Sequence, residues 1–301
     1  MSPDPSAPLV ESAPAKVNLT LRVLGRRSDG YHEIESLVVF AEFGDRLRLL
    51  PGAALTLEVN GPTAAKAGEI DSNLVLKAAR EMVARRNGLM LGAFRLDKHL
   101  PVGAGLGGGS ADAGAALRLI AQANGLRRDD PQLHAAARAT GADVPVCLDP
   151  LPRIMRGVGD ILSEPFTLPP LPALLVNPGI AVATKEVFAG WASAAVPSRA
   201  ADFAAIANRS TRDKVMEFLL AQSNDLERPA LALAPVIAEV LAELRATPGC
   251  DLARMSGSGA TCFGLFTTAS AAAEAGRALS AGHPHWWVRA TKLGGAAISP
   301  T

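Results

Sequence analysis

The stretch from Pro101 to Ala115 reads PVGAGLGGGSADAGA and combines a glycine-rich loop with the expected start of a helix. Glycine has no Cβ, so such a loop turns sharply and lets a ligand approach its main-chain N–H groups. Ser110 is the expected N-cap of a helix over Ala111–Asn124, which is rich in alanine and leucine. Because a helix start offers unpaired N–H donors and the positive end of the helix dipole, the stretch predicts a site for nucleotide phosphates.

Two other glycine-rich phosphate loops fit this stretch poorly. A Walker A loop needs a Gly-Lys pair, and the sequence contains none. A Rossmann GxGxxG pattern is present at Gly103, Gly105 and Gly108, but it should follow a fully buried strand. The preceding run, Phe94–Leu100, alternates polar and apolar residues as a half-exposed strand does, and the acids at 129–130 lie in a turn-like context. A flexible glycine loop that binds no ligand stays open at this point.

The order Pro-x-Gly-x-Gly-Leu-Gly-Gly-Gly-Ser resembles the phosphate-binding motif of the GHMP kinases, which use ATP to phosphorylate small molecules. The triple glycine is similar to one branch of that family, whose acceptor is an alcohol linked to cytidine diphosphate. Many members carry two serines after the glycines, whereas this chain has Ala111 in the second position. The resemblance implies that ATP is bound by the whole loop, namely Pro101, Val102, Gly103, Ala104, Gly105, Leu106, Gly107, Gly108, Gly109 and Ser110.

Two further segments supply the expected catalytic residues. The run Ala15–Val23 alternates polar and apolar residues, which predicts a strand with one buried face and places Lys16 and Asn18 together on the other. Taken alone, that face is solvated, but Pro-Ala-Lys-Val-Asn-Leu resembles a family motif whose lysine and asparagine face the phosphate acceptor. Gly-Ala-Asp-Val-Pro resembles the segment with the catalytic acid, here Asp143. Since Val144 precedes a proline, we expect Asp143 at a break between a helix and a short strand.

The remaining site residues come from the resemblance alone. Tyr31 and His32, in the turn GRRSDGYH, are similar to the pair that holds the cytosine of the acceptor in this branch of the family. Thr184 and Phe188 match a Thr-x-x-x-Phe pattern in which the phenylalanine forms the other wall of that site. Asn73, near the start of a predicted helix, resembles a residue close to the adenine. For each of these residues a purely structural role is the alternative.

The fold implied by the resemblance is α+β, an α/β sandwich of two GHMP-kinase-like domains with the second ferredoxin-like. We place the first domain at residues 1–163 and the second at residues 164–301, with the boundary in the proline-rich run that follows Ser163. Met-Ser-Gly-Ser-Gly-Ala from Met255 is similar to a second glycine loop that packs against the first. Within the first domain, Arg46–Leu50 and Leu55–Val59 are expected to form a hairpin around Pro-Gly.

Composition excludes several other classes of protein. The chain has 301 residues and a formal net charge of +1, which argues against binding to nucleic acid. The cysteines at 147, 250 and 262 are widely spaced, so we expect neither a disulfide framework nor a zinc site. A membrane span needs about 20 apolar residues, and no apolar run in the chain is that long. The first residues do not resemble a signal peptide. A cytoplasmic protein that is a monomer or a weak dimer is expected.

The implied chemistry is phosphoryl transfer from ATP to an alcohol. Asp143 would accept the proton of the attacking hydroxyl, and Lys16 would stabilise both the carboxylate and the charge on the phosphoryl group. Mg²⁺ is expected to bridge phosphate oxygens, with no metal site built from side chains alone. Another alcohol acceptor, or a regulator that binds nucleotide without catalysis, remains as an alternative. A hydrolase is disfavoured, because the chain has no Gly-x-Ser-x-Gly motif.

Overall fold

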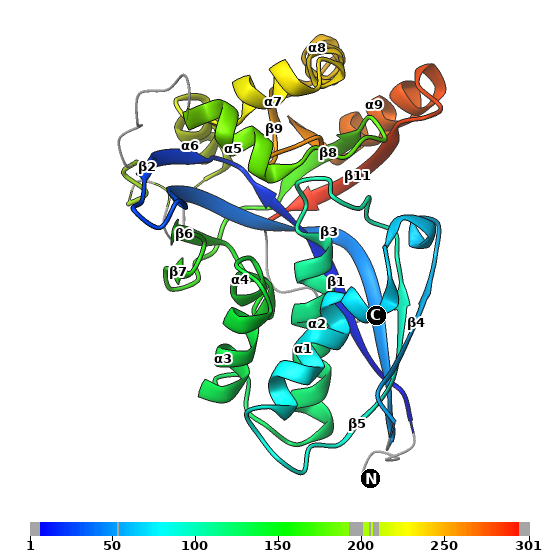
Figure 1. Cartoon of the computed structure of the whole chain (residues 1–301). Helices are drawn as coiled ribbons and strands as arrows, with labels where there is room; N and C mark the ends of the chain where they lie inside the picture. Colours follow the sequence, from blue (N-terminus) through cyan, green and yellow to red (C-terminus); the bar gives the residue numbers. More distant parts are fainter. Residues whose placement is uncertain (1–6, 53, 193–200, 205, 207–210, 295–301) are drawn as a thin grey trace.

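The long strand β3, His32–Gly52, links all parts of the molecule. The computed structural model describes residues 7–294 except 53, 193–200, 205 and 207–210. Strand β3 pairs with four other strands of the N-terminal part and, through Ala41 and Leu293, with the sheet of the C-terminal part. The pairing makes one continuous sheet in the order β4-β5-β3-β11-β8-β10-β9, which Figure 1 shows running through both halves.

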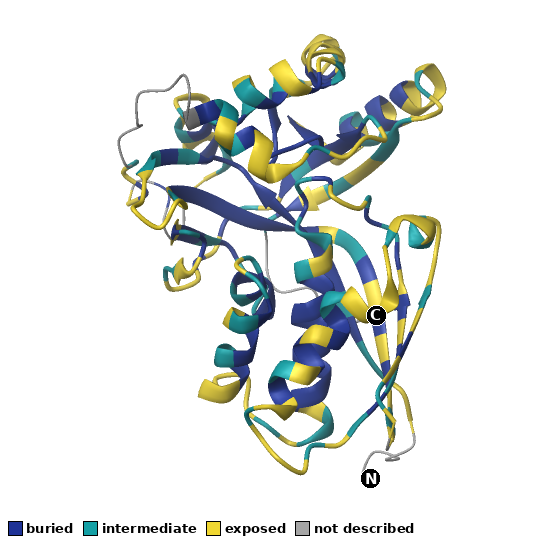
Figure 2. Cartoon of the chain, viewed as in Figure 1, coloured by how far each residue is buried: buried dark blue, intermediate teal, exposed yellow. Residues whose placement is uncertain are grey.

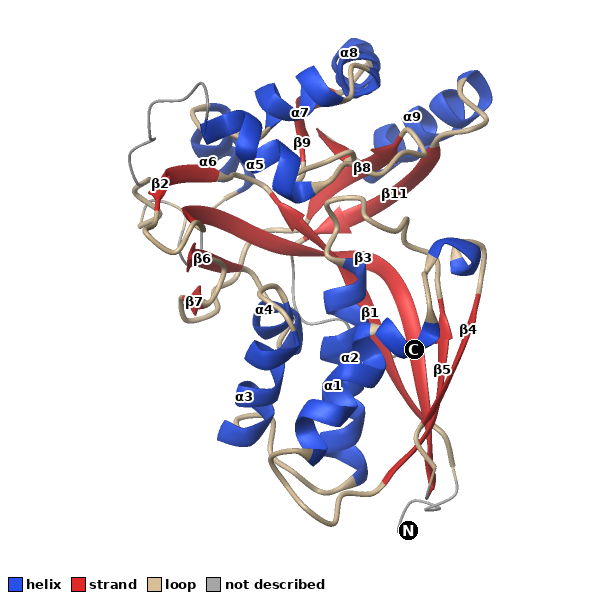
Figure 3. Cartoon of the chain, viewed as in Figure 1, coloured by secondary structure: helices blue, strands red, loops and turns tan. Residues whose placement is uncertain are grey.

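In the N-terminal half, helices α1 to α4 gather on one face of the sheet (Figure 3). Helix α2 is the most deeply buried of them and packs directly on β1, as the dark blue ribbon of Figure 2 shows. The strands of this half are β1 Leu9–Asn18, β2 Arg22–Arg26, β3, β4 Thr56–Asn60, β5 Leu91–Asp97, β6 Arg153–Gly157 and β7 Ile161–Leu162, and the helices are η1 Ala64–Lys66, η2 Ile70–Ser72, α1 Leu74–Val83, α2 Gly108–Ala123, α3 Pro131–Thr140 and α4 Val144–Leu148.

Small residues let the helices of this half approach each other closely. Helix α2 carries Gly114 where it passes α4, and a Cβ added there would lie 2.5 Å from the main-chain oxygen of Cys147. An approach this close needs glycine, since no real side chain fits in the gap. The contact holds α4 against α2, and the residues that begin the two helices, Gly107 and Asp143, both lie beside Lys16 of β1.

The C-terminal half has the ferredoxin-like arrangement that the family resemblance implies. Its four strands run antiparallel in the order β11-β8-β10-β9, with helices α8 and α9 packed against them. Its elements are β8 Leu171–Asn177, α5 Thr184–Ala192, α6 Arg212–Leu220, α7 Glu227–Leu233, α8 Val236–Ala246, β9 Cys250–Met255, β10 Cys262–Phe266, α9 Ala269–Gly282 and β11 Trp287–Leu293. The predicted α+β fold is therefore confirmed. Among the described helices, none is long and apolar enough to cross a bilayer.

Three sequence predictions about these elements were wrong. The expected hairpin does not form, because Pro51 and Gly52 continue β3 opposite β5, and β4 pairs in parallel with the other edge of β5. The expected strand Ala15–Val23 is two strands, since β1 ends at Asn18 and β2 begins at Arg22. The residues after Asp143 form helix α4 in place of an extended strand. Proline is tolerated in the first turn of a helix, and there it outweighs the restriction on Val144.

A buried charge cluster lies beneath the glycine-rich loop. Lys98, just after β5, donates to Asp45 of β3 at 2.5 Å and to Asp112 of α2 at 2.7 Å. The other oxygen of Asp45 accepts from the main-chain N–H groups of His99 and Leu100, whereas Oδ1 of Asp112 has no partner among the described residues. Burial raises the pKa of Asp112 well above its ordinary value, although attraction to Lys98 opposes the shift. The cluster fixes the start of α2 to two strands.

Asp112→Asn is expected to leave the free energy of unfolding nearly unchanged. The amide keeps an oxygen for Lys98 and removes a carboxyl whose charged form burial disfavours. Asp45→Asn should cost about 1.5–3 kcal/mol, because the amide cannot accept from the lysine and from both N–H groups at once. Urea unfolding of both variants measures the difference. Equal losses of stability would contradict this division of roles.

Candidate active site

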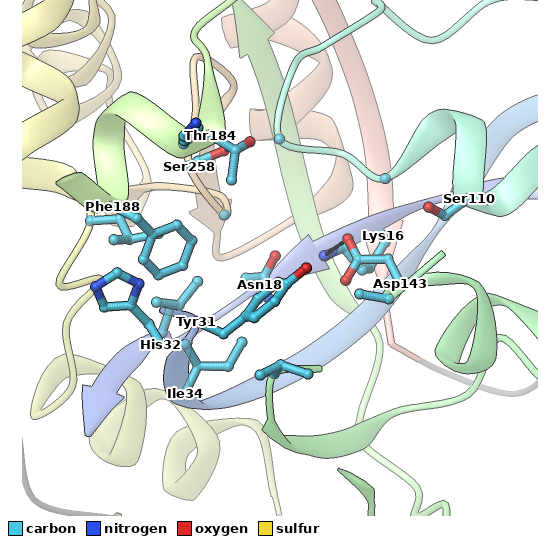
Figure 4. Close-up of a pocket in the computed structure, with 18 of the residues that line it drawn as sticks. Lys16, Asn18, Tyr31, His32, Ile34, Ser110, Asp143, Thr184, Phe188 and Ser258 are labelled. Carbon is cyan, nitrogen blue, oxygen red and sulfur yellow. Dashed lines mark hydrogen bonds and ion pairs between the residues drawn. The ribbon is translucent and has the colours of Figure 1, made fainter. Parts of the chain in front are cut away.

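A cleft of about 1190 Å³ lies between the two halves of the molecule. Its walls are formed by β1, the β2–β3 turn, the glycine-rich loop, the start of α4, α5 and the loop between β9 and β10. In Figure 4 the Lys16–Asp143 pair lies toward one end of the cleft, the His32–Phe188 pair toward the other, and Asn18 between them. The cleft therefore has a charged end, next to the glycine-rich loop, and an aromatic end.

The glycine-rich loop ends in a helix start that is shaped to bind an anion. Helix α2 begins at Gly108, and its N-cap is Gly107 in the left-handed conformation at φ 61°. The predicted N-cap, Ser110, is instead the third residue of the helix, because glycine takes the left-handed N-cap backbone at little cost. The first helical hydrogen bond runs from Ala111 to Gly107, so the N–H groups of residues 108–110 are left for a ligand.

The second glycine loop holds the first in place, as the family resemblance implies. Ser256 donates its hydroxyl to the main-chain oxygen of Gly105 at 3.1 Å, and the N–H of Thr261 donates to the oxygen of Ala104 at 3.1 Å. A Cβ on Gly105 would lie 2.4 Å from the main-chain oxygen of Ser256. The two loops are thus in main-chain contact, which restrains the glycine-rich loop before any ligand binds.

The lysine and the aspartate that the sequence singled out form an ion pair. The Nζ of Lys16 lies 2.9 Å from Oδ2 of Asp143, and the lysine is 5% exposed while about a third of the aspartate side chain reaches the cleft. The lysine stem runs along Gly107, where an added Cβ would lie 3.1 Å from Cε. The main-chain N–H of Lys16 donates to the oxygen of Leu106. The pair therefore lies directly beside the start of α2.

Aromatic side chains line the other end of the cleft. The ring of His32 stacks on Phe188 with 4.9 Å between centroids, and Trp191 meets the same imidazole edge-on at 5.5 Å. Burial and the nearby guanidinium of Arg26 lower the pKa of His32 below its ordinary value, which favours the neutral imidazole. Tyr31 is 65% exposed at the mouth of the cleft. This end offers flat apolar faces together with ring nitrogens that can bind a base edge.

The structure brings most of the predicted residues together. Among the residues that line the cleft are Lys16, Asn18, Tyr31, His32, Gly103, Ala104, Gly105, Gly107, Gly108, Gly109, Ser110, Asp143, Thr184 and Phe188. Pro101, Val102, Leu106 and Asn73 are not among them. The side chain of Asn73 caps α1 by accepting from the N–H of Val75, and Leu106 is buried in the core. For these four residues a role in binding ATP stays a prediction.

Sequence reasoning missed three residues of this site. Ser258 lines the cleft and shares a hydrogen bond of 2.8 Å with Thr184, which ties α5 to the second glycine loop. Trp191 follows Phe188 by three residues, a spacing that places both on one face of a helix and could have indicated it. Arg26 lines the cleft next to His32 as its cross-strand partner, and no sequence signal distinguishes it from a surface arginine.

Comparison with known proteins places the chain in a family. Residues 73–149 match the model of the GHMP kinases N terminal domain, and residues 201–285 match that of the GHMP kinases C terminal domain. A 4-diphosphocytidyl-2-C-methyl-D-erythritol kinase of Methylorubrum extorquens is 55% identical over 95% of this chain and 99% of its own. The enzyme with the same name from Rhodopseudomonas palustris is 56% identical over 95% of this chain and 97% of its own.

Solved structures agree with this placement. A crystal structure of 4-(cytidine 5'-diphospho)-2C-methyl-D-erythritol kinase covers 96% of this chain and all of its own, with a TM-score of 0.74 and 33% identity. Homoserine kinase from Cytophaga hutchinsonii, at 20% identity and a TM-score of 0.71, shares the fold. The chain belongs to the GHMP kinase family and, within it, to the 4-diphosphocytidyl-2-C-methyl-D-erythritol kinases.

Proposed function

We propose that this chain transfers the γ-phosphoryl group of ATP to the 2-hydroxyl of 4-diphosphocytidyl-2-C-methyl-D-erythritol, a step of the non-mevalonate isoprenoid pathway. The observation that carries the proposal is the position of the Lys16–Asp143 ion pair. It lies beside the open N–H groups of α2 and in the same cleft as the His32–Phe188 stack. A nucleotide triphosphate at one end and a cytidine at the other would meet at that pair.

Asp143 acts in this proposal as the general base. Its carboxylate reaches the cleft while the adjoining lysine is almost fully buried, so the aspartate is the member of the pair that a substrate hydroxyl meets. As the bond between the acceptor oxygen and the γ-phosphorus forms, the proton passes to the carboxylate and the bond to the β-phosphate oxygen breaks. ADP leaves with those electrons.

Lys16 and the N–H groups at the start of α2 stabilise the charge on the transferred group. Both are held before substrate arrives, the lysine by Gly107 and Leu106 and the loop by the second glycine loop. Preorganised donors of this kind lower the barrier without any cost of rearrangement during the reaction.

We assign the cytosine of the acceptor to the aromatic end, between Tyr31 and Phe188. The phenylalanine lies on α5, whose first residue Thr184 is fixed by Ser258. The imidazole of His32 stacks on the same ring, and its Nε2 is buried without a partner among the described residues. A neutral imidazole nitrogen can bind the hydrogen-bonding edge of a pyrimidine.

Mg²⁺ fits this site as an ion held mainly by nucleotide phosphates. Among the described residues there is no group of three or more metal-ligating side chains. The hydroxyl of Ser110 lines the cleft, Ala111 offers only a buried methyl group, and Asp112 is bound by Lys98. Ser110 and water would complete its coordination, and the ion, when bound, would neutralise charge on the phosphates.

Four further expectations from the sequence stay predictions. They are the domain boundary, a cytoplasmic location, the monomer or weak dimer and the absence of nucleic-acid binding.

Asp143→Asn is expected to lower kcat by at least about 100-fold, since general-base catalysis contributes typically 10²–10⁴-fold. Binding of ATP should change little, because the loop does not depend on the carboxylate. Release of ADP with and without acceptor measures turnover, and calorimetry measures binding. Asp149→Asn is the matched control, since Asp149 follows the same helix but pairs with Arg153 outside the cleft. Turnover close to that of the unmodified enzyme would refute the assignment of Asp143 as base.

Tyr31→Ala is expected to raise KM for the acceptor and to leave KM for ATP unchanged. Stacking of a base on an aromatic ring is worth about 1–3 kcal/mol, which corresponds to roughly a 5- to 150-fold change. Steady-state kinetics with the full acceptor and with an analogue that lacks the cytosine separate the two contributions. If both acceptors lost affinity to the same degree, Tyr31 would not contact the base.

Removal of divalent cations with EDTA is expected to abolish turnover, and Mg²⁺ should restore it. Ser110→Ala should then raise the Mg²⁺ concentration needed for half-maximal rate, because it removes the hydroxyl that this cleft offers next to the phosphates. A titration of rate against free Mg²⁺ measures both effects. An unchanged half-maximal concentration in the variant would exclude Ser110 as a ligand.

A further inference from the structure

The amide of Asn18 lies in the middle of the cleft and has one unused hydrogen-bonding atom. Asn18 is 1% exposed, two residues after Lys16 on β1. Its Nδ2 donates to the hydroxyl of Ser36 at 2.7 Å, while its Oδ1 is buried without a partner among the described residues. Figure 4 shows Asn18 between the Lys16–Asp143 pair and the His32–Phe188 stack, which is where the acceptor alcohol would lie.

Ser36 decides which end of this amide faces the cleft. The hydroxyl of Ser36, fully buried on β3, donates its only proton to the main-chain oxygen of Thr20 at 2.6 Å. A carbonyl oxygen cannot donate, so the direction of this bond is certain. The oxygen of Ser36 can then only accept from Asn18, which places Nδ2 on the serine and Oδ1 toward the cleft. The orientation follows from hydrogen-bond chemistry alone.

The main chain around Asn18 is also fixed. Its N–H donates to the hydroxyl of Ser256 at 3.1 Å, and Ser256 in turn donates to Gly105 of the phosphate loop. On the cleft side, Gly257 faces the amide, and an added Cβ there would lie 3.3 Å from Oδ1. This oxygen accepts and cannot donate, so the ligand group that would satisfy it is a hydrogen-bond donor.

We propose that Ser36 is a positioning residue for acceptor specificity: through Asn18 it makes the site require a second free hydroxyl on the alcohol, next to the one that is phosphorylated. The inference rests on the proposed function and extends it. Lys16 and Asn18 alternate along β1, so their side chains emerge on one face about 7 Å apart. The donor hydroxyl therefore lies a short distance along the carbon chain from the reacting oxygen. In the proposed acceptor the candidates are the hydroxyls on C1 and C3.

Fluorine in place of a hydroxyl separates donating from accepting. Analogues of the acceptor with fluorine at C1 or at C3 keep the size of the oxygen but donate nothing, so at least one of them would leave Oδ1 of Asn18 unpaired. A site built around a substrate hydroxyl discriminates strongly against an analogue that lacks it, and here we expect a loss of at least about 10-fold in kcat/KM. Ser36→Ala frees the amide to rotate and present Nδ2, so the ratio of kcat/KM between parent and analogue should fall toward one.

Two variants of similar size complete the test. Ser36→Thr keeps a hydroxyl and should keep the discrimination. Ser36→Cys offers sulfur, a weak acceptor, and should lose most of it even if Ser36→Ala does not fold. The ratio between two substrates is measured on the same enzyme sample, so a partly unfolded variant or a general structural defect does not change it.

Each outcome decides the proposal. Two results together support it. The unmodified enzyme must have a lower kcat/KM with at least one fluoro analogue than with the parent, and Ser36→Ala or Ser36→Cys must lose that discrimination. Equal kcat/KM for parent and both analogues in the unmodified enzyme overturns the role of Asn18 as an acceptor. Discrimination that persists in the alanine and cysteine variants overturns the role of Ser36. Failure of the unmodified enzyme to phosphorylate the parent compound would instead reject the proposed function itself.

Discussion

The ion pair between Lys16 and Asp143 is the interaction on which the rest of the site depends. It joins a strand near the amino terminus to the start of a short helix 127 residues later. The stem of the lysine lies against Gly107 of the glycine-rich loop, where an added Cβ would be 3.1 Å from Cε and the backbone is left-handed. A buried lysine is costly unless it is paired, and the aspartate beside it, with about a third of its side chain exposed, can still reach a ligand. The same contact therefore stabilises the buried lysine and holds the carboxylate of Asp143 at the cleft.

One buried guanidinium holds the two elements that carry this pair. Arg118 of α2 donates to the main-chain oxygen of Ser12 in β1 at 2.5 Å and to that of Cys147 in α4 at 2.8 Å. It also binds Glu11 at 2.9 Å, which balances its charge. With Gly114 closing the gap to α4, helix α2 both presents its open N–H groups to the cleft and sets the distance between lysine and aspartate. The contacts of Arg118 and Gly114, which lie outside the cleft in the interior of the N-terminal half, thus position the Lys16–Asp143 pair.

Local patterns in the sequence predicted the parts that depend on neighbouring residues. The glycine-rich loop and the helix that follows it appear in the structure, because each depends on turn chemistry or side-chain period. The alternation around Lys16 predicted a strand, which forms as β1, but the expectation of one buried face was wrong because the residues on both faces of that segment are buried. Partner choice between strands could not be read in this way. Strand β4 has the alternating pattern of any hairpin strand, yet it pairs in parallel with β5, a choice made by the whole sheet.

The residues of the site also differ in whether the local sequence indicates their role or only the folded structure does. Lys16, Asp143, Tyr31 and His32 stand in motifs, and the structure brings them into one cleft. Ser36 lies in the segment that follows Tyr31 and His32, and its hydrogen-bonding role arises only when Thr20 and Asn18 are placed beside it. The sequence around Asp143 does not predict helix α4, because the restriction on Val144 is local whereas the packing of α4 on α2 involves residues far apart in the chain.

The structure of a complex with a non-hydrolysable ATP analogue and the cytidine diphosphate-linked acceptor would test the central claim most directly. The account predicts that the γ-phosphate lies at the start of α2, that the acceptor hydroxyl lies within hydrogen-bond distance of Asp143, and that Lys16 contacts both the carboxylate and the phosphate. An acceptor hydroxyl directed away from Asp143, with the Lys16–Asp143 pair unbroken and distant from the γ-phosphate, would contradict it.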